Sequence, residues 1–131
     1  ILSIAASKLG AGEIIAMDYD PVAVSVAEEN IHKNGVHNVA VFESDLLTAC
    51  AGASPAELII ANIIADIIIR LFDQLDCHLA PGGVLLASGI IDDRIVDVER
   101  AAAAHGYTVL DMTCEKEWAA MIIRRSSELG C

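Results

Sequence analysis

The sequence predicts an α/β fold in which a doubly wound, mostly parallel sheet ends in an antiparallel hairpin. Four of its short apolar runs are nearly continuous, which is typical of strands buried on both faces of a parallel sheet. Helical patterns separate these runs, so right-handed crossover helices can join successive strands. Two strand-like runs near the end are joined by too few residues for a crossover, which favours a hairpin. The apolar runs are residues 14–17, 39–42, 58–61, 84–87 and 119–123.

Residues 1–9 have the apolar spacing of a helix, and no strand-like run precedes them. A doubly wound sheet normally places its first strand near the middle of the sheet. We therefore expect the sequence to begin inside its first crossover helix, so that the first strand and the loop after it are missing from this chain.

The next helix has clear start and stop signals. Asp20 is expected to be its N-cap, and Pro21 fits the first helical position, where a missing N–H costs nothing. Asn34 and Gly35 follow the last apolar residue and supply the stop. This helix therefore connects the strand at 14–17 to the strand at 39–42.

Two further helices are expected, the first after Asn62 and the second from about residue 92 to Gly106. The Pro-Gly-Gly sequence at 81–83 is expected to end the first helical region before the strand at Val84. The apolar positions of the two helices, spaced three or four residues apart, are Ile64, Ile67, Ile68, Leu71 and Leu75, and then Ile95, Val98 and Ala102.

The end of the chain departs from this alternation. Residues 107–113 and 117–125 are strand-like and are joined by a turn at 114–116, so they should form an antiparallel hairpin at the edge of the sheet. We assign residues 1–125 to one domain and residues 126–131 to a tail.

The charge and the apolar content exclude several classes of function. A net charge of −11 argues against direct nucleic-acid binding, which depends on clustered Lys and Arg. The acidic surface could suit a basic protein substrate, or it could only keep the domain in solution. With 55% hydrophobic residues the chain can bury a core, yet no apolar block approaches the roughly 18 residues of a membrane span. We expect a soluble protein.

The cysteines and the opening stretch indicate a cytoplasmic protein without a metal site. No Cys-x-x-Cys pair occurs, and no histidine stands at metal-ligand spacing from a cysteine. Residues 1–9 lack the basic start and the cleavage site of a signal peptide.

Polar residues at the ends of two expected strands are candidates for nucleotide binding. Asp18 ends the strand at 14–17, where open α/β sheets bind ligands, and a carboxylate there can accept both hydroxyls of a ribose. Asp45 and Leu46 follow the strand at 39–42, and they could hold an adenine amino group and line its ring. The alternatives are structural, since Asp18 could only cap a helix, although Asp20 is better placed for that, and Asp45 could only form a turn.

Asn62 is the candidate for positioning a reacting nitrogen. It ends the strand at 58–61, and its amide offers an acceptor and donors that could hold an amine and aim its lone pair. The alternative is an N-cap for the next helix, a position that Asn favours.

Several short motifs lie along nearly the whole chain. They are residues 1–11, Met-Asp-Tyr-Asp-Pro (17–21), Glu-Asn (29–30), Asn-Gly (34–35), Ala-Asn-Ile-Ile-Ala (61–65), Pro-Gly-Gly (81–83), Ser-Gly-Ile (88–90) and Glu-Trp (117–118). Together they resemble the PrmA family of bacterial methyltransferases, which modify the eleventh protein of the large ribosomal subunit. The Asp-x-Asp-Pro step and the Pro-Gly-Gly turn occur in class I methyltransferases generally, whereas Asn-Ile-Ile-Ala and the late Glu-Trp are more particular to this family.

The residues after Asn62 indicate the kind of acceptor. Methyltransferases that act on planar amide or base nitrogens often have Asn-Pro-Pro-aromatic at this strand end, whereas Asn62 is followed by Ile-Ile-Ala. A flexible alkyl amine is therefore the favoured acceptor.

The resemblance implies a Rossmann-like class I methyltransferase domain that uses S-adenosyl-L-methionine. In that family the targets are the N-terminal amine and lysine amines of the ribosomal protein, so the implied partner is a ribosomal protein and not nucleic acid, a membrane or a metal. It places ribose recognition on Asp18 and catalytic positioning on Asn62. It also implies that the glycine-rich loop and a separate N-terminal substrate-recognition domain precede residue 1. The candidate cofactor-binding residues are Asp18, Tyr19, Asp45, Leu46 and Asn62.

Two other functions compete with this hypothesis. A nicotinamide-dependent oxidoreductase would share the ribose aspartate, but Tyr107 is followed four residues later by Asp111 where short-chain dehydrogenases have lysine. Gly10-x-Gly12 also precedes a strand, whereas a dinucleotide-binding loop follows one. The other alternative is an inactive fragment that folds without binding a cofactor.

Overall fold

The computed structural model describes residues 1–128. These residues divide into two compact units, Ile1–Gly52 and a second unit that begins at Ala53. Each unit contains its own sheet: β1 and β2 pair in the first unit, and the second has four strands in the order β3-β4-β6-β5. Strands alternate with helices in both units, which confirms the α/β class. The assignment of residues 1–125 to one domain stays a prediction.

The first unit contains two parallel strands, each preceded by a helix. Strands β1 and β2 are in register from Ile14 opposite Val39 to Asp18 opposite Glu43, so their carboxyl ends coincide. The elements are α1 (Leu2–Lys8), β1 (Ile14–Asp18), α2 (Pro21–Lys33), β2 (Val39–Glu43) and the 3-10 helix η1 (Thr48–Cys50).

Helix α2 begins and ends where its sequence signals predict. The side chain of Asp20 accepts a hydrogen bond from the backbone N–H of Val22 at 2.9 Å, and Pro21 occupies the first helical position. Asn34 is the C-cap, and Gly35 follows with a φ of +65°, a conformation that glycine adopts without a steric penalty.

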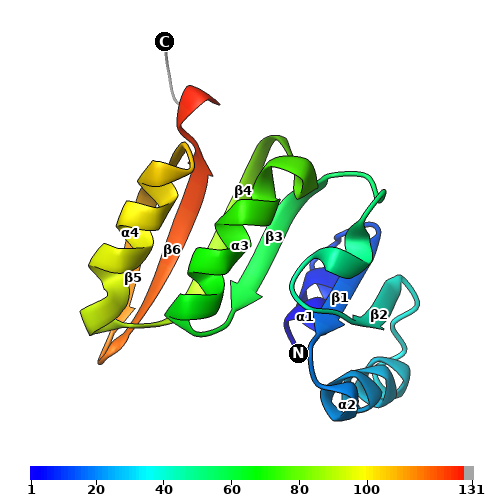
Figure 1. Ribbon diagram of the computed structural model, residues 1–131. Helices are drawn as coiled ribbons and strands as arrows, with labels where there is room; N and C mark the ends of the chain where they lie inside the picture. The colour runs from blue at the N-terminus through cyan, green and yellow to red at the C-terminus, as the bar shows by residue number, and fades with distance from the viewer. Residues whose placement is uncertain (129–131) are drawn as a thin grey trace. The chain divides into compact units, whose positions relative to one another are not determined.

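The second unit is a mixed sheet with one parallel pairing, β3 with β4, and two antiparallel pairings, β4 with β6 and β6 with β5. Helices α3 and α4 cover the same face of this sheet (Figure 1). The elements are β3 (Ala56–Asn62), α3 (Ala65–His78), β4 (Leu79–Ile91), η2 (Asp92–Arg94), α4 (Ile95–Ala104), β5 (Tyr107–Glu115), β6 (Trp118–Arg125) and η3 (Ser126–Glu128).

Strand β4 begins earlier than the sequence suggests. It starts at Leu79, which pairs with Ala56, and the regular register resumes only with Val84 opposite Leu58. The Pro-Gly-Gly segment is therefore an irregular insertion within the strand, and does not precede it. Proline has no N–H for the ladder, so pairing can resume only after residue 83.

The terminal hairpin is confirmed, but its turn lies later than expected. Strand β5 continues through Cys114 and Glu115, and Glu115 pairs directly with Trp118. The turn is therefore Lys116–Glu117, with a φ of +56° at Lys116. Such two-residue connections suit the right-handed twist of paired strands. Of the tail expected at 126–131, residues 126–128 form η3, and residues 129–131 lie outside the described part of the chain.

The largest core lies between α3, α4 and the four-stranded sheet. The predicted positions Ile68, Leu71 and Leu75 are buried, whereas Ile64 is 63% exposed because it precedes the first turn of α3. Ile95 is only partly buried. No helix among residues 1–128 has the length and apolar character needed to cross a membrane. The fully buried side chains include Ile68, Phe72, Leu75, Leu79, Leu85, Ile90, Val98, Tyr107, Met121 and Ile123.

His105 joins the end of α4 to α3. Its ring stacks on Phe72 with 5.8 Å between centroids, Nδ1 lies 2.8 Å from the carbonyl oxygen of Ala101, and Nε2 lies 2.8 Å from Asp73. The hydrogen bond to Ala101 and then the one to Asp73 raise the pKa of His105 above its ordinary value, and the charge of Asp76 acts in the same direction. Both bonds are complete only when the imidazole is protonated.

We expect Asp73→Asn to lower the pKa of His105, as measured by NMR titration of the imidazole protons. A pKa raised by folding adds stability that is fully present below the unfolded pKa of about 6.5 and is lost as pH rises through the folded pKa. The melting temperature of the variant should therefore fall further below that of the parent at pH 6 than at pH 8.5. An unchanged pKa in the variant would show that the Asp73 contact is too exposed to matter.

Candidate functional site

The carboxyl ends of β1 and β2 bring together the residues expected to bind a nucleotide. Asp18 is the last residue of β1, and its carbonyl oxygen accepts a hydrogen bond of 2.9 Å from the N–H of Ser44, the first residue after β2. Asp45 and Leu46 follow Ser44 directly, so the loop that carries them is fixed to the end of β1. All three candidate side chains therefore lie at one edge of this sheet.

Two neighbouring carboxylates have different roles at the start of α2. Asp20 caps the helix, so the capping role considered for Asp18 belongs to Asp20. The Oδ1 atom of Asp18 accepts the N–H of Asp20 at 2.9 Å, which holds the exposed Asp18 carboxylate in one orientation beyond the strand. Tyr19 lies between them and is 77% exposed. The carboxylate of Asp18 and the ring of Tyr19 are both accessible to a ligand.

Leu46 has an unusual backbone conformation, with a φ of +55°. Left-handed conformations cost a residue such as leucine about 1–2 kcal/mol, so surrounding contacts must hold it. The buried Ser44 supplies these contacts: its hydroxyl donates to the carbonyl oxygen of Leu46 at 2.9 Å and accepts from the N–H of Ala49 at 3.0 Å. Strain held in place in this way is typical of ligand-binding loops.

Asn62 is the last residue of β3, and its side chain is exposed. The N-cap of α3 is Ile64, which makes no capping bond through its side chain. The alternative that Asn62 caps this helix is therefore wrong. Two residues separate the strand from the helix, and the backbone is fixed there by a 3.1 Å hydrogen bond from the N–H of Ile63 to the carbonyl oxygen of Ser88.

Gly89 lies against Asn62 from the neighbouring strand β4. Its φ is +82°, and a Cβ atom on it would lie 2.9 Å from Oδ1 of Asn62 and 2.9 Å from the carbonyl oxygen of Ile63. In the sequence, Gly89 stands out only as part of the Ser-Gly-Ile motif, which by itself predicts no role for it. A glycine inside a strand pattern is itself a signal for a bulge or a close backbone approach.

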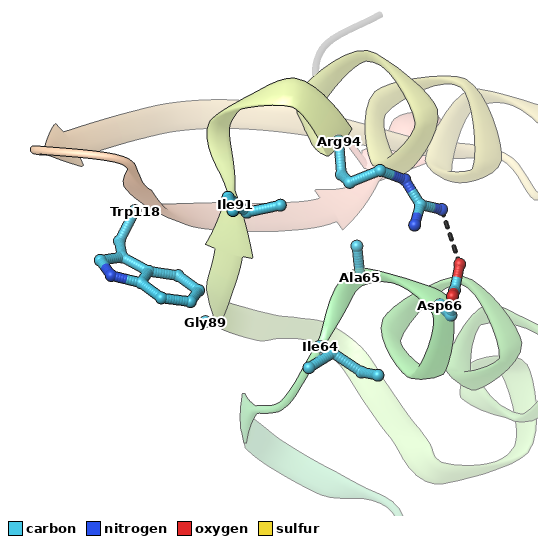
Figure 2. A pocket seen from close by; sticks show the side chains of 7 residues that line it. All are labelled: Ile64, Ala65, Asp66, Gly89, Ile91, Arg94 and Trp118. Carbon is cyan, nitrogen blue, oxygen red and sulfur yellow. Dashed lines mark hydrogen bonds and ion pairs between the residues drawn. The ribbon is translucent and has the colours of Figure 1, made fainter.

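A shallow pocket of about 220 Å³ opens beside this point in the second unit. Figure 2 shows Trp118, Gly89 and Ile91 on one side, the start of α3 on the other, and Arg94 reaching Asp66. This pocket could not be predicted from the sequence, because its walls come from separate elements. The pocket is lined by Ile64, Ala65, Asp66, Gly89, Ile91, Arg94 and Trp118.

The pocket has apolar walls and a charged rim. Ile64, Ile91 and Trp118 are 63%, 39% and 49% exposed, which is high for large apolar side chains. At the rim, Arg94 lies 2.6 Å from Asp66 and 2.8 Å from Asp97. The hydrogen bond from Arg94 holds the pKa of Asp66 below its ordinary value, so this carboxylate stays ionised. The walls can accept an alkyl chain, and the rim adds fixed charges of both signs.

No metal centre is present among residues 1–128, since no group of three or more His, Cys, Asp or Glu side chains is placed to hold an ion.

Comparisons with known proteins identify relatives of this chain. The family model described as "Ribosomal protein L11 methyltransferase (PrmA)" matches residues 1–126. A ribosomal protein L11 methyltransferase from Caldanaerobacter subterraneus is 47% identical over 95% of this chain, and one from Heliobacterium modesticaldum is 44% identical over 96%. The crystal structure of a ribosomal protein L11 methylase from Lactobacillus delbrueckii superposes with a TM-score of 0.88 at 34% identity, and covers 95% of this chain and 64% of that one.

The chain spans about 40% of the length of these two curated relatives. The match of the family model extends over nearly all of its residues and over both compact units. By this match, the chain belongs to the ribosomal protein L11 methyltransferase (PrmA) family.

Proposed function

We propose that this chain supplies the methyltransferase part of an enzyme that transfers methyl groups from S-adenosyl-L-methionine to amino groups of ribosomal protein L11. Membership of the family over residues 1–126 is the observation that carries this proposal. The acceptors we propose are lysine side chains and the N-terminal amine of a cytoplasmic ribosomal protein substrate.

The first unit offers residues that fit the nucleoside end of the cofactor. The carboxylate of Asp18 is exposed and oriented at the carboxyl end of β1, where it can accept the two ribose hydroxyls. We propose that Asp45 accepts a hydrogen bond from the adenine amino group and that Leu46, which is held by Ser44, lines the ring. Tyr19 adds an exposed aromatic surface next to Asp18.

Asn62 is the residue that we assign to catalysis. S-adenosyl-L-methionine supplies an electrophilic methyl group on a sulfonium. The enzyme then has to bring a neutral amine into line, exclude water and let a proton leave, which needs neither a metal nor a covalent intermediate. The oxygen of an exposed amide at a strand end can accept a hydrogen bond from an N–H of the amine and leave its lone pair free. Because the amide is neutral, it does not stabilise the protonated amine, which has no free lone pair.

The pocket of the second unit supports an alkyl amine as the acceptor. Its apolar walls, Ile64, Ile91 and Trp118, fit the methylene stem of lysine, and the ionised carboxylate of Asp66 suits a positively charged substrate at the rim. The net charge of −11 favours a basic protein over a nucleic acid as partner.

A methylation assay tests the proposal. It uses a protein in which this chain replaces its matching segment in the Caldanaerobacter relative, called the completed protein below. We expect the completed protein to transfer labelled methyl groups from S-adenosyl-L-methionine to purified ribosomal protein L11, and mass spectrometry of the digested product should locate them on lysine and the N-terminal amine.

Two results would contradict this function. Methyl transfer to another atom class, such as a planar amide nitrogen, would overturn the acceptor, while the cofactor would stand. Equilibrium dialysis that finds binding of a nicotinamide dinucleotide but not of S-adenosyl-L-methionine would favour the oxidoreductase alternative.

A further inference from the structure

Strand β4 contains a bulge at the point where it passes the end of β3. Its register against β6 shifts between Ala87 and Ile90, so Ser88 and Gly89 together lie opposite a single residue of β6. On the other side, Ser88 remains paired with Asn62 of β3. Bulges of this kind bend one strand locally and occur often beside functional sites. This bulge turns the backbone of Gly89 toward Asn62.

The contacts of Gly89 are concentrated on Asn62 and the residue after it. A Cβ atom at Gly89 would lie 2.9 Å from Oδ1 of Asn62, 2.9 Å from the carbonyl oxygen of Ile63 and 3.2 Å from the N–H nitrogen of Ile63. Real Cβ contacts are essentially never shorter than 3.0 Å, and backbone atoms cannot move aside as a flexible side chain can. Any other L-residue at this position would displace the Asn62–Ile63 segment.

This close approach distinguishes Gly89 from the other glycines with positive φ in residues 1–128. At four of the others, a Cβ atom would have nothing within 4 Å, and at Gly82 it would meet only the end of the Arg124 side chain at 3.8 Å. Turn geometry alone therefore explains those glycines, but it does not explain Gly89. The four glycines without neighbours are Gly10, Gly35, Gly52 and Gly106.

We propose that Gly89 is a positioning residue for Asn62: the bare backbone of the β4 bulge forms the surface that holds the Asn62 amide in its working orientation. This inference rests on the catalytic role proposed for Asn62. Gly89 also lines the pocket, so a side chain added at this position could act by filling the pocket or by turning the Asn62 amide. The two effects have to be distinguished. A filled pocket raises the KM for the protein substrate, whereas a misdirected amide lowers kcat.

The test compares Gly89→Ala with Gly106→Ala in the completed protein. The two glycines share a φ of +82°, so both variants place an alanine at a positive φ, but only the methyl group at residue 89 meets other atoms. We expect Gly89→Ala to lower kcat at least tenfold with little change in KM, while Gly106→Ala keeps the parental kcat. Equal kcat values for the two variants, or a change confined to KM, would overturn the proposal.

A second measurement reports on the contact without using activity. The side-chain amide NMR signals of Asn62, assigned by comparison with Asn62→Ala, should shift in Gly89→Ala and stay in place in Gly106→Ala. Unshifted signals in Gly89→Ala would contradict the contact. If Asn62→Ala instead retains parental turnover, the proposed catalytic role of Asn62 fails, and the NMR result still decides whether Gly89 orients its amide.

The double variant Asn62→Ala/Gly89→Ala completes the test. If Gly89 acts through Asn62, adding Gly89→Ala to Asn62→Ala should cost no further kcat. If Gly89→Ala alone does not fold, the melting curve of the double variant decides. Recovery of a cooperative melt locates the decisive clash at the Asn62 side chain. Failure to recover locates it at the backbone of Ile63, so that Gly89 would serve the path of the chain and not the Asn62 amide, and the proposal would be overturned.

Discussion

Replacing Asp18 with alanine in the completed protein is expected to weaken binding of S-adenosyl-L-methionine by about 2–3 kcal/mol, or about 30- to 160-fold. The reason is the loss of charge-assisted hydrogen bonds from the ribose hydroxyls to a carboxylate that the N–H of Asp20 already holds in place. Titration calorimetry at constant salt measures the change directly.

Asp20→Ala is the matched control, because it removes a carboxylate two residues after Asp18 that has a different role. Its side chain caps α2 through the N–H of Val22, so this variant should lose about 1 kcal/mol of unfolding free energy. It should bind the cofactor nearly as tightly as the parent. If both variants bind like the parent, the ribose does not contact Asp18 and the assignment is wrong.

Asn62→Asp is expected to lower turnover of ribosomal protein L11 about tenfold or more in the completed protein. The substitution keeps the size of the side chain but replaces the amide donors with a second acceptor and adds a negative charge. Because Asn62 is exposed and does not cap α3, the melting temperature should stay near that of the parent. Initial rates at saturating cofactor, together with a thermal melt, measure both effects.

Asn30→Asp provides the control for the charge change, since Asn30 is an exposed residue of α2 in the other compact unit. This variant should keep parental turnover. Parental turnover in Asn62→Asp as well would mean that a charged carboxylate serves there as well as the neutral amide, and the role proposed for the Asn62 amide would fail.

Local sequence signals predicted the elements of this protein that depend on neighbouring residues. Asp20 and Pro21 fixed the start of α2, and Asn34 with Gly35 fixed its end. These features follow from interactions within a few residues, namely caps, N–H availability and glycine conformation. The short apolar run at 14–17 likewise predicted that Asp18 lies at a strand end.

Predictions from local sequence patterns were wrong where the structure depended on pairing between distant segments. The Pro-Gly-Gly sequence suggested a break before a strand, but pairing of Leu79 with Ala56 extends β4 across it. The spacing of Ile64 suggested a buried helix face, yet Ile64 precedes α3 and lines a pocket. Periodicity records that a residue is apolar, but it does not say whether the core or a ligand covers it.

Composition, periodicity and short motifs are properties of the chain alone, so they sufficed to predict the α/β class, the family, the strand ends at Asp18 and Asn62, and the place of Asp45 just after a strand. How these side chains are held depends on contacts between distant segments. The approach of Gly89 to Asn62 requires β3, β4 and β6 to be in one particular register with a bulge in β4. Register is set by the combined packing of whole strands, so no local pattern around either residue contains it.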